Sequence, residues 1–196
     1  MARQRDEEKQ AAILEAAALV IAEQGLGAPT AKIAKVAGVA DGTLFVYFPT
    51  KANLFDKLYL AIKDELVEAM LAGFPVQKSL KDQLFHMWKV RTTWGVAQPA
   101  KRKALAQLAV SELVISNCRR AGVDKANEVV TLLAKVCACG PLQSTPENFA
   151  GALFEAMAAT TMDFMTNEPE QAELYCAAAF KSLWAALTTR EISCDG

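Results

Sequence analysis

The chain has 196 residues, of which 53% are hydrophobic, and its formal net charge at neutral pH is −1. This hydrophobic content is ample for a buried core and excludes an intrinsically disordered chain. The longest apolar stretches are interrupted by Glu112, Glu155 and Asp163, and the first nine residues are mostly polar with no apolar core, so we expect neither a membrane span nor a signal peptide. We therefore expect a cytoplasmic protein whose five cysteines are reduced thiols.

The first predicted helix covers about residues 6–24. Ile13, Ala17 and Val20 share one face at helical spacing, and a Gly-Leu-Gly sequence follows the helix and ends it. Arg3 and Arg5 precede the helix on a predicted flexible tail. This tail is either a solvated terminus or a basic arm that contacts a phosphate or the minor groove of DNA.

Residues 30–51 predict two short helices joined by a turn that contains glycine. Thr30 is predicted to cap the first helix, and Gly38 tolerates the left-handed conformation that the turn requires. Asp41 is predicted to cap the second helix, which a proline ends. The buried side of the second helix is predicted to contain Leu44 and Phe48.

The same stretch carries the sequence run Ile33-Ala34, Ala37-Gly38-Val39-Ala40, Gly42-Thr43-Leu44-Phe45, Tyr47-Phe48, Lys51 and Leu54. This run resembles the signature of the tetracycline-repressor (TetR) family of bacterial regulators. The resemblance implies an all-α fold of about nine helices, with an N-terminal helix-turn-helix DNA-binding domain and a C-terminal effector-binding and dimerisation domain. The expected domain ranges are 1–50 and 51–196. The family also leads us to expect a homodimeric repressor, rather than an activator, that a small molecule releases from operator DNA.

The second short helix is predicted to enter the major groove of double-stranded DNA. Thr43 and Tyr47 are predicted to lie opposite the buried side, where their hydroxyls suit phosphate contacts, and the resemblance assigns the same role to Lys51. The exposed residues available for base contacts include no Arg, Asn or Gln, so thymine methyls and DNA shape must contribute more. The predicted DNA-binding residues are Thr30, Lys32, Ala40, Asp41, Gly42, Thr43, Val46, Tyr47 and Lys51.

Two of these assignments have structural alternatives. Tyr47 is either a phosphate contact or a half-buried aromatic side chain, and Asp41 is either a helix cap or a carboxylate facing DNA. The charge of the segment also weakens the expectation of tight binding, because residues 1–51 carry as many acidic as basic side chains. We expect Lys32, Lys35 and Lys51 to compensate through their positions in the motif.

A long helix is predicted over residues 50–72, and it joins the two halves of the chain. Further helices are predicted over residues 79–98, 99–120, 123–139, 146–166 and 169–190, with no strand pattern. The last two each carry two apolar stripes. One stripe of each can serve the core and the other a partner subunit, so we expect a homodimer through helices 146–166 and 169–190. The alternative is a single domain that buries both stripes.

An effector pocket for a small lipophilic molecule is predicted between the long helix and the C-terminal helices, because aromatic and methionine side chains can line an adaptable apolar cavity. The predicted lining residues are Leu66, Met70, Phe85, Trp88, Arg91, Trp94, Phe154, Met157 and Met162. Arg91 would suit an anion, whereas Glu112 or Asp163 would suit a cation.

Catalysis has little support, because there is one histidine and no nucleophile with an adjacent base, and we expect no cofactor and no metal site. One alternative function is thiol or metal sensing through Cys118, Cys137, Cys139 and Cys176. Cys137 and Cys139 would point about 200° apart on a helix, so they would not chelate a metal by themselves. The other alternative is a helical ligand-binding protein that no longer binds DNA.

Overall fold

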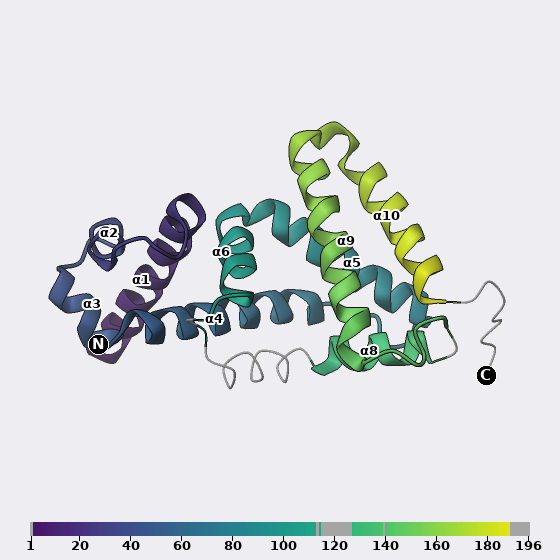
Figure 1. Ribbon diagram of the computed structural model, residues 1–196, viewed down its shortest axis with the longest axis horizontal. Coiled ribbons are helices and arrows are strands. Elements are labelled where there is room, and N and C mark those ends of the chain that lie inside the picture. The colour runs from purple at the N-terminus through teal and green to yellow at the C-terminus, as the bar shows by residue number, and fades with distance from the viewer. Residues whose placement is uncertain (1, 113, 115–126, 139, 189–196) are drawn as a thin grey trace. The chain divides into compact units, whose positions relative to one another are not determined.

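The computed structural model describes residues 2–112, 114, 127–138 and 140–188, and over these residues the chain is helical with no strand (Figure 1). The helices are α1 (Ala2–Gln24), α2 (Thr30–Val36), α3 (Asp41–Tyr47), α4 (Lys51–Leu71), α5 (Leu80–Ala97), α6 (Pro99–Ala109), α8 (Asn127–Cys137), α9 (Glu147–Asn167), the 3₁₀ turn η1 (Pro169–Gln171) and α10 (Ala172–Leu187). The predicted all-α fold is confirmed. None of the helices in these ranges combines the length and the hydropathy that a membrane span requires.

The helices form two compact units. The first unit contains α1, α2, α3, α6 and the part of α4 up to Glu65, and the second contains the remainder of α4, α5, α8, α9 and α10. Helix α6 therefore belongs to the same unit as the helix-turn-helix, and it packs there against α1.

The core of the first unit forms where α1 packs against α2 and α6. Its buried side chains include Ile13, Ile21, Ile33, Leu44, Leu54, Phe55, Leu58 and Leu108. Polar contacts join the same helices. Lys101 Nζ of α6 lies 2.6 Å from Glu15 Oε1 of α1 and 2.6 Å from Glu65 Oε2 of α4, and Gln107 Nε2 donates to the Ile21 carbonyl at 3.2 Å. The first unit is thus braced from its N-terminal helix to α6.

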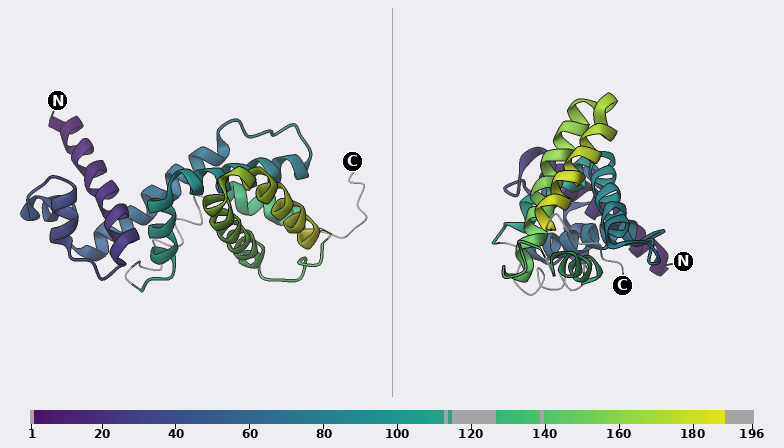
Figure 2. Two further views of the ribbon diagram at one scale, coloured as in Figure 1. Left: turned by 90° about the horizontal axis from the view of Figure 1, so that it is seen from above. Right: turned by 90° about the vertical axis from the view of Figure 1, so that its right-hand side faces the viewer.

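In the second unit α9 packs against α10, α5 and α8 (Figure 2). Trp88 of α5 is completely buried at the centre of this arrangement. Its indole Nε1 donates to the Cys176 carbonyl at 2.9 Å, and its ring meets Phe154 edge-on with the centroids 5.4 Å apart. The tryptophan therefore has both apolar packing and a partner for its polar atom, which its burial requires.

Several helix boundaries differ from those expected. Helix α1 begins at Ala2, so Arg3 and Arg5 lie in its first turn and not on a tail. The N-caps of α2 and α3 are Pro29 and Ala40, each with extended ψ (142° and 148°) and neither with a side-chain cap bond. Thr30 and Asp41, which follow them, are therefore the first helical residues and not the caps. The predicted capping by Thr30 and by Asp41 was therefore wrong.

The helix predicted over residues 99–120 ends at Ala109. Gln98 precedes Pro99 and has non-helical backbone angles, as residues before proline usually do. This break separates α5 from α6. After Ala109 the chain continues in turns in which Ser111 N donates to Leu108 O and Val114 N donates to Ser111 O. These turns join residues three apart, which is close to the 3.6-residue period of an α-helix, so the apolar pattern of the sequence did not distinguish the turns from a helix. Residues 115–126 lie outside the described ranges.

Candidate DNA interface

The turn between α2 and α3 is built around Gly38. Its φ is +69°, in the left-handed region that glycine adopts at little cost. The Val39 N–H donates to the Ala34 carbonyl at 3.0 Å and the Gly38 N–H to the Lys35 carbonyl at 3.2 Å. These two bonds form a Schellman motif, which ends α2 and satisfies its last carbonyls. The sequence indicated this turn correctly because its determinants lie within six residues.

Helix α3 buries one face and exposes the opposite one. Leu44 is completely buried and Phe48 is 2% exposed, as predicted, whereas Val46 is 78% exposed. Thr43 and Tyr47 are half-buried and lie together on one side of the buried face. Their predicted position opposite Leu44 was wrong, because at about 100° per residue Val46 and Gly42 lie farthest from it. The outermost side chain of α3 is therefore apolar.

Tyr47 already donates a hydrogen bond within the chain. Its hydroxyl lies 2.8 Å from Asp6 Oδ1 of α1. This hydrogen bond and the carboxylate charge raise the pKa of Tyr47 above its usual value of 10.0. A phenol has one proton to donate, so a phosphate at this position would compete with Asp6 for it.

Lys51 is held at the start of α4. Its Nζ donates to the Ala28 carbonyl at 2.7 Å and lies 5.5 Å from the centre of the Phe55 ring. An ammonium has three donors, so this bond leaves others for a phosphate. The same helix end is capped by Thr50, whose Oγ1 accepts from the Asn53 N–H at 3.0 Å. The lysine is thus fixed in place beside α3.

The remaining predicted DNA contacts lie on the outside of the motif. Ala40, Asp41 and Gly42 are exposed, and Thr30 and Lys32 are half-buried on α2. The sequence analysis missed one exposed side chain of α3, Phe45, which is 41% exposed. Its position next to the buried Leu44 gave no indication that it points outward. Only the packing of α3 in the folded structure distinguishes Phe45 from a core side chain.

Most of the residues predicted to line an effector pocket are core side chains in the second unit. The buried ones are Leu66, Met70, Trp88, Arg91, Phe154 and Met162. Trp94 and Met157 are half-buried, and Phe85 is 36% exposed with its ring centroid 4.8 Å from that of Phe180.

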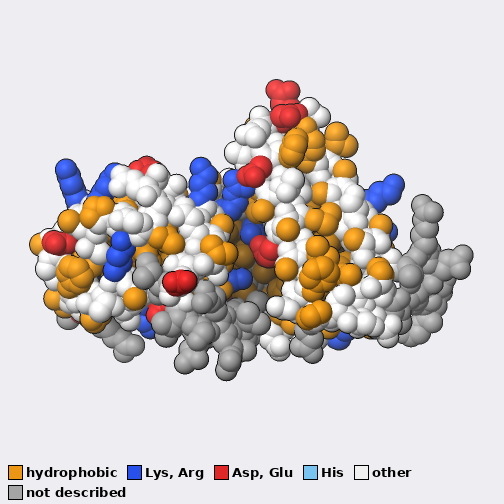
Figure 3. All heavy atoms as spheres, viewed as in Figure 1, with side chains coloured by type: hydrophobic (Ala, Val, Ile, Leu, Met, Phe, Trp, Pro, Cys, Tyr) orange, Lys and Arg blue, Asp and Glu red, His pale blue; other side chains and the backbone are white. Residues whose placement is uncertain are grey.

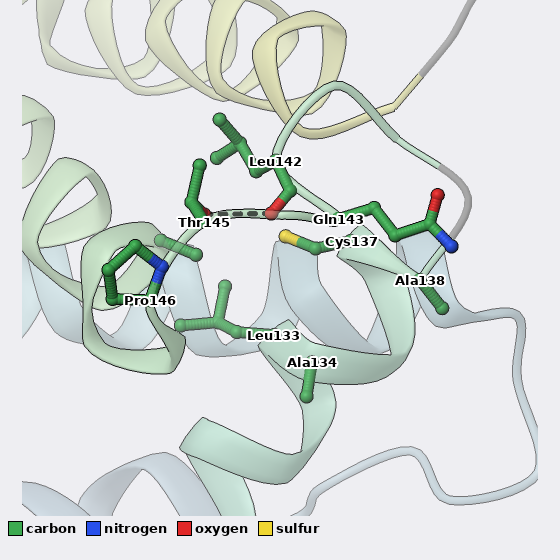
Figure 4. Close-up of a pocket in the computed structure, with 9 residues that line it drawn as sticks. Leu133, Ala134, Cys137, Ala138, Leu142, Gln143, Thr145 and Pro146 are labelled. Atoms are coloured by element: carbon green, nitrogen blue, oxygen red, sulfur yellow. Dashed lines mark hydrogen bonds between the residues drawn. The ribbon is translucent and has the colours of Figure 1, made fainter.

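A hollow of about 120 Å³ lies between α8, the segment 140–146 and the start of α9 (Figure 4). Its lining residues are Leu133, Ala134, Cys137, Ala138, Leu142, Gln143, Thr145, Pro146 and Ala150. Figure 4 shows the Cys137 thiol directed between Leu142 and Leu133. None of the predicted pocket residues lines this hollow.

The cysteines that can be placed are buried. Cys137 and Cys176 are free thiols, and burial raises the pKa of Cys137. Cys118 and Cys139, which the alternative of thiol or metal sensing also needs, lie outside the described residues. Among the residues that the structure describes, no group of histidine, cysteine or acidic side chains could hold a metal ion.

One of the two apolar stripes of α9 is buried, and the other is exposed mainly at its two ends. The stripe of Ala150, Phe154, Ala158, Thr161 and Met165 is buried. In the other stripe, Phe149 is 43% and Phe164 is 49% exposed, with Leu153, Met157 and Thr160 between them. Hydrophobic side chains gather over α9 and α10 on the face drawn in Figure 3.

The two stripes expected on α10 do not match its faces. One stripe was expected to contain Leu174, Ala177, Phe180, Trp184 and Leu187. In the structure Leu174 and Ala177 are exposed, whereas Phe180 and Leu187 are buried. On an α-helix, residues three apart are offset by about 60° around the axis, so a stripe of residues spaced mostly by three winds around the helix. The outward face is instead formed by Leu174, Ala177, Ala178, Lys181 and Ala185.

Residues 13–58 match a family model described as bacterial regulatory proteins of the tetR family. This segment contains most of α1, both short helices and the start of α4. The fatty acid metabolism regulator protein of Bacillus subtilis (strain 168) is 37% identical over 73 residues. That match spans 37% of this chain and 38% of the relative.

Two crystal structures extend the similarity over nearly the whole chain. A tetR family transcription regulator from Shewanella sp. PV-4 is 29% identical with a TM-score of 0.82, covering 93% of this chain and 99% of that one. A TetR family transcription regulator from Marinobacter aquaeolei VT8 has a TM-score of 0.86 at 22% identity, covering 96% and 100% of the two chains, and shows the shared fold. The relatives are transcription regulators and not enzymes, as the sequence indicated.

Proposed function

Since the chain is a TetR-family transcription regulator with a helix-turn-helix DNA-binding domain, we propose that it is a cytoplasmic repressor released from its operator by a small lipophilic effector. Regulators of this family bind operator DNA and act as dimers. The observation that carries the proposal is the outward face of α3, where Val46 is exposed, together with the half-buried Thr43 and Tyr47 on one side of that face and Lys51 at the start of α4. Hydroxyl and ammonium groups are typical phosphate contacts, and they would hold α3 in the major groove.

Thr30 and Lys32 of α2 are proposed as further contacts to the DNA backbone. Ala40, Asp41, Gly42 and Val46 are proposed to face the bases. Two recognition helices in a dimer would lie in successive major grooves, whose separation on B-DNA is about 34–36 Å.

The effector is proposed to bind in the second unit, among the aromatic and methionine side chains around Trp88, Phe154 and Met162. The name of the Bacillus subtilis relative, a fatty acid metabolism regulator, supports a lipophilic ligand. Because most of these side chains are buried, a ligand would have to displace some of them, and that rearrangement is a route to a second conformation. Coupling between two sites is typically about 1 to 3 kcal/mol, and DNA would weaken effector binding by the same factor.

The dimer is proposed to form through helices 146–166 and 169–190. The partly exposed stripe of α9 and the alanine-rich outward face of α10 support this, because small side chains permit close packing of helices. Ala156→Arg, on the exposed side of α9, is expected to convert the dimer to a monomer in sedimentation equilibrium. Ala106→Arg, at an exposed position of α6, is the matched control. A dimer that survives Ala156→Arg would exclude this interface.

The test of the proposed function is a fluorescence-anisotropy titration with DNA from upstream of the gene, with scrambled DNA as a control, at several salt concentrations. We expect selective binding whose log affinity falls linearly with log salt. Tyr47→Phe and Lys51→Ala should weaken binding to both DNAs alike, while the dimer persists. Absence of binding to either DNA at low salt would refute the proposal, and unchanged affinity in one variant would remove that residue from the interface.

Release by an effector needs a separate measurement on the complex. Fatty acids and fatty acyl thioesters of graded chain length are suitable lipophilic probes, with the matching short-chain acids as polar controls. We expect one of the long-chain probes to lower operator affinity by about 5- to 150-fold, the usual range for allosteric coupling. If every long-chain probe leaves operator affinity unchanged, the lipophilic effector is excluded for this chemical class.

A further inference from the structure

We propose that α3 recognises its operator through the 5-methyl groups of pyrimidine bases, with Val46 as the specificity-determining residue and Gly42 as the point of closest approach. This inference rests on the proposed operator binding and adds the chemical class of the base edges that are recognised. The exposed face of α3 has few of the side chains by which proteins usually recognise bases.

The outward positions of α3 carry no hydrogen-bond donor in their side chains. Val46 is 78% exposed, Phe45 is 41% exposed, and Asp41 and Gly42 are also exposed. Specific contacts to guanine usually come from Arg or Lys, and those to adenine from Asn or Gln. Asp41 can only accept. The bidentate contacts that specify purines are therefore not available from this face.

The major groove contains one apolar group, the 5-methyl of thymine. An isopropyl side chain packed against this methyl group removes apolar surface from water on both sides. The same side chain packed against a polar base edge would leave that edge without the water to which it was bonded. Val46 therefore favours thymine in two ways, by attraction to the methyl group and by the cost of covering another base.

Gly42 is a second, independent indication of close approach. It lies four residues before Val46 and so on the same face of α3. A Cβ added at Gly42 would meet no atom of the chain within 4 Å, and its φ is not in the left-handed region. Glycine weakens a helix relative to alanine, and nothing within the described chain requires it here. A glycine at this position lets the backbone approach a base edge that a methyl group would hold away.

DNA is the occupant that fits this face, because the face is continuous with the groups proposed for phosphate contacts. Thr43 and Tyr47 lie together on one side of Val46 on α3, and Lys51 follows at the start of α4. All of these residues lie within the segment that matches the tetR family model. Hydroxyl and ammonium groups beside an apolar centre match DNA, whose phosphates border the base edges of the groove.

The test begins with the full-length protein and a pool of random duplexes, from which the tightest binding sequence is selected. Each thymine of that sequence is then replaced by deoxyuridine, which removes the 5-methyl group alone. We expect one or two positions in each half-site at which uracil lowers affinity by about fourfold, the value of one buried methyl group. Restoring a methyl there as 5-methylcytosine, paired with guanine, should recover part of the loss relative to cytosine.

Variants connect this effect to the proposed residue. Val46→Ala should bind the thymine and uracil duplexes alike, whereas Val110→Ala should discriminate between them as the unchanged protein does. Val110 is a matched control because it is 83% exposed and lies outside α3. Equal binding of both duplexes by the unchanged protein, or continued discrimination by Val46→Ala, would overturn the assignment.

Gly42→Ala tests the close approach. The variant should melt at the same temperature as the unchanged protein or higher, but bind the selected duplex at least tenfold more weakly. Unchanged affinity would overturn the close approach at Gly42. If no sequence is selected at any salt concentration, the proposed operator binding fails together with this inference. If a sequence is selected but its methyl groups have no effect, this inference alone fails.

Discussion

Arg91 is a buried cation whose carboxylate partner in the described part of the chain is Glu155. Its side chain joins α5 to α9. Nε lies 3.3 Å from Glu155 Oε1 and 3.2 Å from Oε2, Nη2 lies 2.8 Å from Oε2, and Nη1 lies 3.2 Å from Met162 Sδ. The Arg91 side chain is 5% exposed, whereas that of Glu155 is 46% exposed. Removing the glutamate would leave a guanidinium that water reaches poorly.

The magnitude follows from the separation of the charges. Two unit charges about 4 Å apart interact by about 4 kcal/mol at an effective dielectric of 20 and about 1 kcal/mol in water. Because Glu155 is half in solvent, the lower part of this range applies, and we expect Glu155→Ala to lower the free energy of unfolding by about 1 to 3 kcal/mol. Arg91→Met removes the charge together with the need for a partner and should cost less, about 1 kcal/mol.

The double variant distinguishes an ion pair from two independent contacts. Once Arg91 is methionine, loss of the Glu155 carboxylate should cost almost nothing, so Arg91→Met/Glu155→Ala should be about as stable as Arg91→Met. Urea denaturation at one fixed protein concentration is the assay, because subunit association changes the apparent stability. Glu68→Ala, at an exposed position of α4, is the control. Additive losses in the double variant, or a loss for Glu155→Ala no larger than for Glu68→Ala, would refute the reasoning.

Three further predictions concern the first unit. Gly38→Ala should lower the melting temperature, because φ of +69° costs an L-residue about 1 to 2 kcal/mol although the Cβ would have open space; unchanged melting would contradict this. Asp6→Asn should lower the pKa of Tyr47 in an alkaline absorbance titration and strengthen DNA binding, because the neutral amide oxygen holds the phenol proton less strongly than the charged carboxylate does; weaker binding would contradict it. Lys101→Met should destabilise the protein at neutral pH. The pKa of Lys101 is raised because its bonds to Glu15 and Glu65 outweigh the desolvation by burial, which is the largest single influence and acts to lower the pKa. The stabilisation from the two ion pairs is therefore complete below the pKa of Lys101 in the unfolded chain and is lost as pH rises through its pKa in the folded chain. If Lys101→Met destabilised the protein as much well above the folded-state pKa as at neutral pH, the ion pairs would be contradicted.

Local sequence signals predicted the helix-turn-helix well. Gly38, the proline after α3 and the spacing of Leu44 and Phe48 act within a few residues, and the turn and the buried face followed from them. The contacts of the same motif were not predictable in this way. Tyr47 meets Asp6 across 41 positions and Lys51 meets Ala28 across 23, and no local pattern encodes such pairs.

The sequence by itself determined that the chain is helical, the approximate position of most helices, and which face of α3 is buried. These properties depend on hydrophobic period, glycine and proline, which act over a turn or two of helix. Only the tertiary structure decided which stripe of α9 is covered, that α6 packs against α1 in the unit that contains the helix-turn-helix, and that Arg91 is paired with Glu155. Both stripes of α9 satisfy the same period, so the choice between them depends on where α5, α8 and α10 pack, and that is a property of the whole fold.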